Sequence, residues 1–249
     1  MPRFFIPPPA LPSSADAPSR AVIDGPDARH IRGALRMRTG DNLTLCDGAG
    51  SDYYCEITGF GDETVELKIL YRAPTACEPT LAVTLYQGLP KGDKLEWIIQ
   101  KAVELGVTRI VPVETARSVA RLTGKEEKKR VRWQRIADEA AGQCGRGILP
   151  PVNTPLTWRQ AVEDMSSRGK DVPLIVCYEG GGEPLSALAD VRTGALSLVI
   201  GPEGGFEPEE IQELTGRGAR IATLGKRILR CETAPLAALA ALMTLSGNL

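Results

Sequence analysis

From Leu81 onward, short apolar runs alternate with segments of helical periodicity, and this alternation constrains the fold more than any other feature. Apolar runs typical of buried strands occupy residues 81–86, 109–113, 174–178, 196–200 and 220–224. Helical patterns lie between or after these runs, among them 93–106 and 126–144. Strands that alternate with helices favour a parallel sheet with helical crossovers. The sequence therefore predicts an α/β domain in this part of the chain.

Two of these helices have recognisable ends. Asp93 can cap the first helix, with Glu96 at the capping-box spacing, and Gly106 ends it. The last helix begins near Thr233, with Pro235 in its first turn. Its apolar stripe comprises Leu236, Leu239, Ala240 and Met243. Such a stripe is typical of core packing, and a dimer interface is the alternative.

Two of the predicted strands end in glycine-containing turns. One leads into Gly201-Pro-Glu-Gly-Gly205, and the other leads into Gly225-Lys-Arg-Ile-Leu-Arg230. Because the carboxyl ends of parallel strands meet at one edge of a sheet, both turns are expected to border one ligand crevice. Glycine has no Cβ, so a ligand can contact the backbone there directly. The alternative for the first turn is an ordinary helix start at Pro208.

Residues up to about 71 follow a different pattern. Apolar runs at 42–46, 53–58 and 64–70 are separated by glycine-containing turns, and one helical piece covers 27–37. This spacing favours a compact barrel or sandwich. The segment 72–79 has two prolines and no periodicity, so we place the domain boundary there, giving domains 1–72 and 73–249.

Composition excludes little. The chain has 30 Lys and Arg against 31 Asp and Glu, a balance that neither predicts nor excludes a nucleic-acid partner. Six cysteines without a C-x-x-C pattern and one histidine give poor support for a metal site and favour reduced thiols in a cytoplasmic protein. The N-terminus lacks a secretory apolar core, and no run is long enough to span a bilayer.

Five stretches occur in the order seen in one known family. They are Arg3-Phe-Phe; His30 to Arg36 with Gly40-Asp41 and Asp47-Gly-Ala-Gly50; Lys91-Gly-Asp-Lys to Gly106; Ile200-Gly-Pro-Glu-Gly-Gly-Phe206; and Leu224-Gly-Lys-Arg-Ile-Leu-Arg-Cys-Glu-Thr-Ala234. Together they resemble the 16S ribosomal RNA uridine-N3 methyltransferases, the RsmE-type branch of the SPOUT superfamily. One departure is Gly142, which stands where the family tends to have a carboxylate, so no role of that carboxylate is carried over to this chain.

The resemblance implies a fold and an activity. It implies a small N-terminal PUA-like RNA-binding β-barrel and a C-terminal SPOUT α/β domain with a trefoil knot. S-adenosylmethionine would donate a methyl group to N3 of a uridine in 16S ribosomal RNA of the small ribosomal subunit. The enzyme would be a homodimer with a shared active site, and it would need no metal and no membrane.

The resemblance also implies a donor pocket formed by the two turns. Its residues would be Ile200, Gly201, Pro202, Glu203, Gly204, Gly205, Leu224, Gly225, Ile228 and Leu229. A branched side chain at Gly204 is expected to block close approach of the donor.

Methylation of uridine N3 requires an oriented donor, loss of the N3 proton and an accessible base edge. Arg230 is the candidate to stabilise charge on the uracil, and a salt bridge to Glu232 or a helix-end contact is the alternative. Glu203 and Glu232 are candidate proton acceptors, and the alternative role for each is to orient the loop by accepting hydrogen bonds from backbone N–H groups.

Basic residues gather in two clusters and are expected to bind phosphates. One comprises Arg117, Arg121, Lys125, Lys128, Lys129, Arg130, Arg132 and Arg135, and the other Arg29, His30, Arg32, Arg36 and Arg38. The predicted RNA-binding set is Arg3, Arg29, His30, Arg36, Lys91, Lys94, Arg117, Lys128, Lys129, Arg132 and Arg146. Without the resemblance, a solvated helix face is the more common explanation for 125–135.

Two rival functions are kept open. One is a SPOUT RNA methyltransferase of other specificity, such as ribose 2′-O. The other is a non-catalytic RNA-binding factor in ribosome assembly. Intact turns at 201–205 and 224–230 argue against the second, because a pure binding protein does not need a donor pocket.

Overall fold

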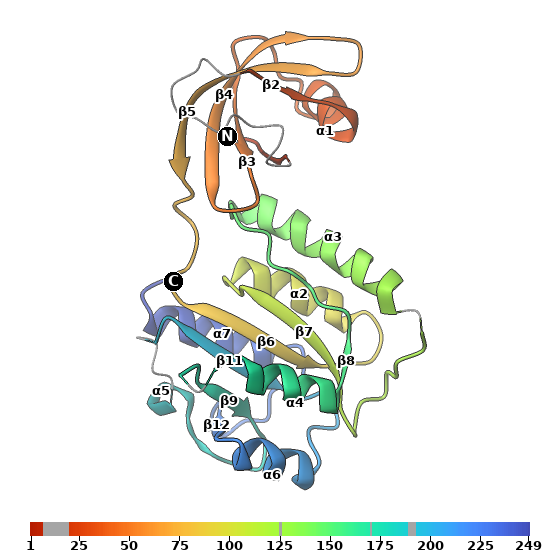
Figure 1. Cartoon of the computed structure of the whole chain (residues 1–249), viewed down its shortest axis with the longest axis vertical. Helices are drawn as coiled ribbons and strands as arrows, with labels where there is room; N and C mark the ends of the chain where they lie inside the picture. The colour runs from red at the N-terminus through yellow and green to blue at the C-terminus, as the bar shows by residue number, and fades with distance from the viewer. Residues whose placement is uncertain (7–19, 125, 170, 189–192) are drawn as a thin grey trace. The chain divides into compact units, whose positions relative to one another are not determined.

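The computed structural model describes residues 1–6, 20–124, 126–169, 171–188 and 193–249 (Figure 1). They form two compact units. One unit comprises Met1–Glu78 and Ala141–Leu149, and the other comprises Pro79–Ala140 and Pro150–Leu249. We call them the N-terminal unit and the C-terminal unit. In the described ranges, no helix is long and apolar enough to cross a membrane.

The N-terminal unit is built on a curled five-stranded sheet (Figure 1). Its strands, in spatial order, are β1 (Arg3–Phe5), β3 (Asn42–Cys46), β4 (Ser51–Phe60), β5 (Val65–Pro74) and β2 (Arg20–Ile23). Only β1 and β3 pair in parallel; the other neighbours are antiparallel. Along β5, Val65 and Leu67 are buried while Glu66 and Lys68 are exposed, the period of two that one buried face produces.

The sheet of the N-terminal unit is a half-barrel. Among the described residues, β1 and β2 form its two edges and do not pair with each other. The helical piece predicted at 27–37 is α1 (Gly25–Arg29) continued by a π-helical turn (His30–Ala34), which together bury Ala28 and Ile31. The compact β-rich fold predicted for this segment is confirmed at this coarser level.

The C-terminal unit is built on a parallel sheet, as predicted, and this sheet has two short strands, β8 (Leu156–Thr157) and β10 (Glu183–Pro184), beyond the five expected. In spatial order its strands are β10, β12 (Arg220–Thr223), β9 (Leu174–Cys177), β11 (Ala195–Ile200), β6 (Ala82–Gly88), β7 (Arg109–Glu114) and β8. Every pair of neighbours in the sheet is parallel. The carboxyl ends of β6, β9, β11 and β12 therefore lie at the same edge of the sheet.

Six helices belong to this α/β part among the described residues. They are α2 (Lys94–Glu104), α3 (Glu126–Cys144), α4 (Trp158–Ser167), α5 (Leu185–Leu188), α6 (Pro208–Gly216) and α7 (Ala234–Leu245). Helices α4 and α6 cover one face of the sheet, where Val162 and Leu214 join a buried cluster with Tyr86. Helix α2 buries an apolar stripe and packs against α7. In α7, Leu239 and Met243 are buried, so core packing accounts for that part of its stripe.

The capping box predicted for α2 is wrong. Asp93 does occupy the N-cap position, but its side chain makes no capping hydrogen bond. Glu96 instead accepts a hydrogen bond from Arg132 on α3 at 2.8 Å. Thr233 likewise occupies the N-cap of α7 without a side-chain cap. The sequence pattern located the starts of both helices, but the side chains at their N-cap positions form no capping hydrogen bond.

Candidate functional site

The two turns predicted to border a crevice lie at the same edge of the parallel sheet. Strand β11 ends at Ile200 and β12 ends at Thr223, with β9 between them. Because the three strands run in the same direction, their carboxyl ends meet where open α/β sheets bind ligands. We call residues 201–206 the first turn and residues 224–230 the second turn.

The first turn passes directly over the end of β6. A Cβ on Gly88 would lie 2.9 Å from the carbonyl carbon of Gly201, so this approach requires glycine at position 88. Beside it, the fully buried Gln87 donates from Nε2 to Gly201 O at 3.4 Å. Sequence reasoning missed both residues. The available signal was a polar residue and a glycine directly after a buried apolar strand.

Gly205, not Gly204, has the left-handed backbone in this turn. Its φ is 68°, and a Cβ there would lie 2.8 Å from the carboxyl carbon of Glu179. A Cβ on Gly204 would lie 2.9 Å from the Cβ of Arg117. A side chain at Gly204 would therefore also meet Arg117, and its expected effect on donor binding stays a prediction.

Arg117 holds the first turn from one side. Its guanidinium donates to Gly204 O at 3.1 Å and to Glu207 Oε2 at 3.0 Å. The neighbouring Ala116 N donates to Glu210 Oε1 at 2.9 Å. Arg117 was predicted to bind RNA; its side chain is 41% exposed and also contacts Gly204 and Glu207, so RNA contact by Arg117 stays a prediction.

Lys94 holds the first turn from the other side and joins it to the segment after the second turn. Its Nζ lies 2.8 Å from Glu203 Oε1 and 3.2 Å from Glu232 Oε2. The backbone N–H of Lys91 also donates to Glu203, at 3.2 Å. The thiol of Cys231 donates to Glu232 at 3.1 Å. Three stretches far apart in sequence therefore meet at one ammonium group, which we call the Lys94 cluster.

The Lys94 cluster keeps both carboxylates charged. Partial burial raises the pKa of Glu203, but the hydrogen bonds from Lys94 and Lys91 N outweigh it, and the net pKa is lowered. The pKa of Glu232 is lowered by the Cys231 thiol and by Lys94. Burial raises the pKa of Cys231 to about 12, so this thiol stays protonated. Carboxylates with lowered pKa values are weak bases, which disfavours both as proton acceptors.

The second turn leaves its backbone open. In the described ranges, no protein group accepts a hydrogen bond from the N–H groups of Lys226, Arg227, Ile228 or Leu229. No atom lies within 4 Å of the position of a Cβ on Gly225, and Ile228 is 84% exposed. The second turn therefore has unused backbone donors and an uncovered apolar side chain.

Arg230 is exposed at the end of the second turn. The salt bridge to Glu232 weighed as its alternative role is not formed, because Lys94 binds that carboxylate. Among the residues that the structure describes, no carboxylate pairs with Arg230. Its backbone carbonyl accepts hydrogen bonds from Thr233 and Ala234 at the start of α7. The guanidinium therefore remains available to an anionic or polar ligand.

These features fit a nucleoside-containing donor such as the expected S-adenosylmethionine. Free backbone N–H groups on the second turn can hydrogen-bond an adenine or ribose, and Ile228 and Leu229 can cover apolar atoms. Beneath the first turn, the buried Oε1 of Gln87 has no hydrogen-bond partner among the residues described. A buried acceptor without a partner is uncommon in folded proteins and is satisfied when a ligand donates to it.

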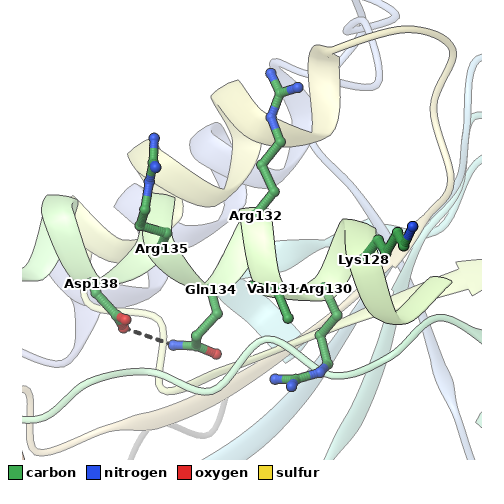
Figure 2. Close-up of a pocket in the computed structure, with 7 residues that line it drawn as sticks. All are labelled: Lys128, Arg130, Val131, Arg132, Gln134, Arg135 and Asp138. Carbon is green, nitrogen blue, oxygen red and sulfur yellow. Dashed lines mark hydrogen bonds between the residues drawn. The ribbon is translucent and has the colours of Figure 1, made fainter. Parts of the chain in front are cut away.

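Helix α3 carries a basic face. A hollow of about 810 Å³ is lined by Lys128, Arg130, Val131, Arg132, Gln134, Arg135 and Asp138 (Figure 2). Figure 2 shows Arg132 and Arg135 projecting to one side of the helix, and their side chains are 64% and 78% exposed. Their ion pairs with Glu96 and Glu139 are exposed and therefore weak, so a phosphate can compete for them.

Lys129 borders a smaller hollow. Its volume is about 190 Å³, and Leu95, Leu122 and Trp133 are among its lining residues. Lys125, the remaining lysine of this predicted cluster, lies outside the described residues. Lys91 is exposed, and only its backbone N–H is engaged with Glu203.

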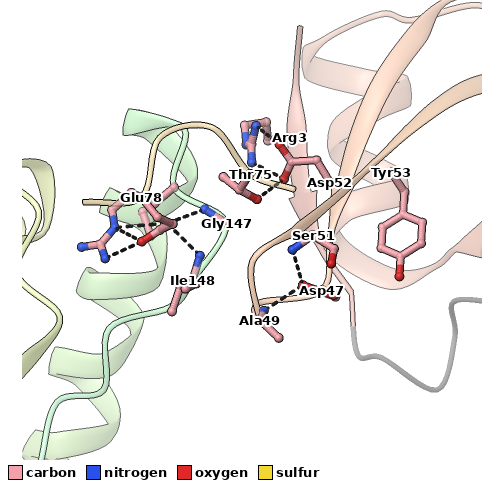
Figure 3. Close-up of polar contacts among 12 residues, drawn as sticks. Arg3, Asp47, Ala49, Ser51, Asp52, Tyr53, Thr75, Glu78, Gly147 and Ile148 are labelled. Atoms are coloured by element: carbon pink, nitrogen blue, oxygen red, sulfur yellow. Dashed lines mark hydrogen bonds and ion pairs between the residues drawn. The ribbon is translucent and has the colours of Figure 1, made fainter. Parts of the chain in front are cut away.

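Two of the predicted RNA ligands have structural roles within the N-terminal unit (Figure 3). Arg146 is 3% exposed and pairs with Glu78 at 2.8 Å, while Glu78 also accepts hydrogen bonds from Gly147 N and Ile148 N. Arg3 binds both carboxylate oxygens of Asp52, at 2.7 and 3.1 Å. Both guanidinium groups are used inside the protein, so the expectation that they bind RNA is corrected.

Arg29, His30 and Arg36 are exposed and remain candidates for RNA contact. Arg36 has a φ of 52°, uncommon for a residue with a side chain.

The departure at Gly142 lies close to Phe5, whose ring would be 3.7 Å from a Cβ at that position. In the described parts of the chain, no group of three or more His, Cys, Asp or Glu side chains could hold a metal ion.

Comparisons with known proteins agree with this arrangement. Residues 77–243 match the RNA methyltransferase domain family, and residues 23–70 match the RNA methyltransferase PUA domain family. The chain is 37% identical over 228 residues to ribosomal RNA small subunit methyltransferase E of Bacillus subtilis (strain 168), covering 88% of both proteins. The Mycobacterium bovis protein of the same name is 33% identical over 240 residues, covering 94% of this chain and 89% of that protein.

Solved structures are similar over the full length. A ribosomal RNA small subunit methyltransferase E from Neisseria gonorrhoeae, bound to S-adenosyl methionine, superimposes with a TM-score of 0.84 at 36% identity and 98% coverage of both chains. A methyltransferase from Legionella pneumophila with bound SAM gives a TM-score of 0.82 at 29% identity, covering 97% of this chain and 96% of that one.

Proposed function

Because this chain belongs to the family of ribosomal RNA small subunit methyltransferases E, we propose that it methylates N3 of a uridine in 16S ribosomal RNA. It is an S-adenosylmethionine-dependent ribosomal RNA methyltransferase. The five sequence stretches that resemble uridine-N3 methyltransferases support N3 as the atom that receives the methyl group. The observation that carries the proposal is the exposed, unpaired Arg230 beside a turn with free backbone donors.

The two turns form the donor site in this proposal. S-adenosylmethionine supplies a methyl group on a positively charged sulfur. Backbone groups of both turns hold its nucleoside, and the free N–H groups of 226–229 support this placement. The pocket comprises the predicted residues 200–205, Leu224, Gly225, Ile228 and Leu229, with Gln87 beneath the first turn. Fixing the donor before reaction lowers the barrier, because orientation can contribute roughly 7–11 kcal/mol.

Arg230 is the proposed catalytic residue. The uracil acquires negative charge as N3 loses its proton, and a guanidinium can stabilise that charge through charge-assisted hydrogen bonds. Glu203 and Glu232 were the candidate proton acceptors. We now assign them a role in fixing the turns, since Lys94 binds both carboxylates and their pKa values are lowered. The chemistry requires no metal.

Exposed cations form the proposed RNA surface. In the C-terminal unit they are Lys128, Lys129, Arg132 and Arg135 around α3, with Lys91. In the N-terminal unit they are Arg29, His30 and Arg36. The PUA domain match supports RNA binding by that unit, and the small ribosomal subunit is the proposed partner.

The same proposal includes a knot in the chain, the bounds of the two domains and the location of the protein in the cell. We propose a trefoil knot in the chain beyond residue 198, supported by the resemblance to SPOUT enzymes and by the first turn crossing closely over Gly88. The proposed domains are 1–72 for RNA binding and 73–249 for methyl transfer. The cytoplasm is the proposed location, because ribosomal RNA is the substrate.

We also propose a homodimer. Leu236, Ala237 and Ala240 of α7 are only partly buried, and Leu245 is 46% exposed. A second copy covering this apolar face would bury it. Light scattering on the purified protein tests this proposal, and a monomer at micromolar concentration would contradict it.

Methyl transfer in vitro tests the function. The purified protein is incubated with methyl-labelled S-adenosylmethionine and either free 16S ribosomal RNA or small subunits that lack the modification. The RNA is then digested to nucleosides. Label in 3-methyluridine is the expected result. Label in a 2′-O-methylated nucleoside would assign a different SPOUT specificity, and binding without transfer would favour an assembly factor.

A further inference from the structure

The Lys94 cluster joins the segments that form the proposed donor site. Glu203 belongs to the first turn, Glu232 follows the second turn, and Lys94 begins α2. Lys94 and Glu203 are 109 residues apart in sequence. No other side chain among the described residues forms ion pairs with carboxylates from both regions. The ammonium therefore links the two turns.

We propose that Lys94 is a positioning residue for the methyl donor: its ammonium holds the two donor-binding turns in register, and it does not bind RNA. This inference rests on the proposed donor site. It replaces the sequence-based expectation that Lys94 contacts phosphate.

The hydrogen-bonding capacity of Lys94 supports this role. An ammonium has three N–H donors. Glu203 and Glu232 take two of them at 2.8 and 3.2 Å, and Cys231 Sγ lies 3.9 Å away in the direction of the third. A phosphate at Lys94 would lie next to two carboxylates whose pKa values are lowered, and repulsion from their charges disfavours that contact.

Partial burial suits a positioning role. The side chains of Lys94, Glu203 and Glu232 are 36%, 32% and 21% exposed. Such ion pairs add little to the stability of the whole fold. They can still restrict two loops to the arrangement that binds a ligand, so that less ordering is required when the ligand arrives. Replacing Lys94 should therefore lower the affinity for the donor more than it lowers the free energy of unfolding.

Lys91 provides a matched control. It lies three residues before Lys94, in the loop that leads into α2, and carries the same charge, but its contact with Glu203 is made by its backbone N–H. Replacing its side chain removes a cation from the loop and leaves the Lys94 cluster intact. Lys91→Met and Lys94→Met thus each remove one positive charge, but Lys94→Met also removes the ion pairs with Glu203 and Glu232.

The experiment measures two affinities on the full-length protein. S-adenosylmethionine binding is measured by calorimetry, and RNA binding is measured as a function of salt. Lys94→Met should weaken donor binding roughly 2- to 30-fold, the loss of two partly exposed ion pairs. Its RNA salt slope should equal that of the wild type. Lys91→Met should keep donor affinity and flatten the slope by about 0.7–0.9 if Lys91 contacts one phosphate.

Two further variants separate positioning from general damage. Lys94→Arg should restore most of the donor affinity, because a guanidinium can also bridge two carboxylates. Glu203→Gln should weaken donor binding, and its effect combined with Lys94→Met should be less than additive. If Lys94→Met does not fold, Glu232→Gln serves the same comparison.

The outcomes distinguish this inference from the proposed function. A wild-type protein that does not bind S-adenosylmethionine would overturn the donor site itself. Wild-type binding with unchanged donor affinity in Lys94→Met would overturn the positioning role alone. A flattened RNA salt slope in Lys94→Met would return Lys94 to the RNA surface.

Discussion

At the scale of single residues, charged side chains divide into those that the fold uses and those that it leaves available. Lys94, Arg117 and Arg146 each bind a carboxylate of the protein, at 2.8, 3.0 and 2.8 Å. In the part of the chain that the structure describes, Arg230 has no such partner, because the carboxylate nearest to it in sequence, Glu232, is held by Lys94. This difference is the physical basis for assigning Arg230 to the substrate.

Arg230→Ala should reduce turnover and leave donor binding nearly unchanged. Losing one group that stabilises developing negative charge typically lowers the rate on the order of 100-fold or more. Raising the pH should partly restore the rate, because more uridine ionises without help. Single-turnover methylation with saturating donor is the measurement. A wild-type rate would remove the catalytic role, and weakened donor binding would move Arg230 to the donor pocket.

Gly205→Val should weaken donor binding more than Gly204→Ala. Valine at a φ of 68° is strained by about 1–3 kcal/mol, and its Cβ would collide with the Glu179 carboxyl group. Gly204 does not have a left-handed φ, so alanine there adds no backbone strain, although its Cβ would lie 2.9 Å from the Cβ of Arg117 and the Arg117 segment would have to shift. Calorimetry with S-adenosylmethionine compares the two. Equal affinities would show that the first turn tolerates both changes and does not form the donor site.

At the scale of elements, the sequence predicted the bounds of helices and strands better than it predicted contacts between side chains far apart in sequence. The bounds expected for β3 (42–46) and α3 (126–144) agree with the structure, because turn glycines and helical periodicity are local signals. The role expected for Arg146 was corrected, and Arg117 has a partner within the protein that was not expected. Arg117 and its carboxylate Glu207 are 90 residues apart, and Arg146 and Glu78 are 68 apart. Only the folded chain brings such pairs together, so no local pattern could reveal them.

The basic face of α3 should carry salt-dependent RNA binding. Replacing Lys128, Arg132 and Arg135 with alanine should weaken RNA binding and flatten the salt slope by up to about 0.9 per lost phosphate contact. Donor affinity should stay the same. Arg159→Ala is a suitable control, because this exposed arginine of α4 pairs only with Glu163 four residues later. An unchanged slope in the triple variant would mean that the α3 face is merely solvated.

At the scale of the whole molecule, the chain alternates between two units. It leaves the N-terminal unit after Glu78, returns to it at Ala141–Leu149, and then completes the C-terminal unit. The buried pair of Arg146 and Glu78 holds the returning segment to the linker inside the N-terminal unit. The linker residues 75–78 and the segment 145–149 therefore stabilise each other.

Glu78→Ala should destabilise the protein without altering the donor site. Removing one partner of a buried ion pair typically costs about 3–5 kcal/mol, because the other charge loses its compensation. Arg146 is 3% exposed and fits that case. The free energy of unfolding in urea is the measurement, with Glu163→Ala as an exposed-pair control. A loss no larger than that of the control would contradict a stabilising role.

A fragment from residue 74 to the end should still bind S-adenosylmethionine. Both proposed donor turns lie beyond residue 200, and a start at 74 keeps the pair of Glu78 and Arg146. RNA affinity should fall, because Arg29, His30 and Arg36 are absent. Calorimetry on a folded fragment checks the first expectation. Loss of donor binding in a folded, dimeric fragment would contradict the placement of the donor site.

The most direct test of the central claim is mass mapping of 16S ribosomal RNA nucleosides from cells with and without this gene. One 3-methyluridine should disappear when the gene is deleted. It should return with the wild-type gene and stay absent or strongly reduced with Arg230→Ala. An unchanged 3-methyluridine content after deletion, or loss of a different modified nucleoside, would contradict the assignment.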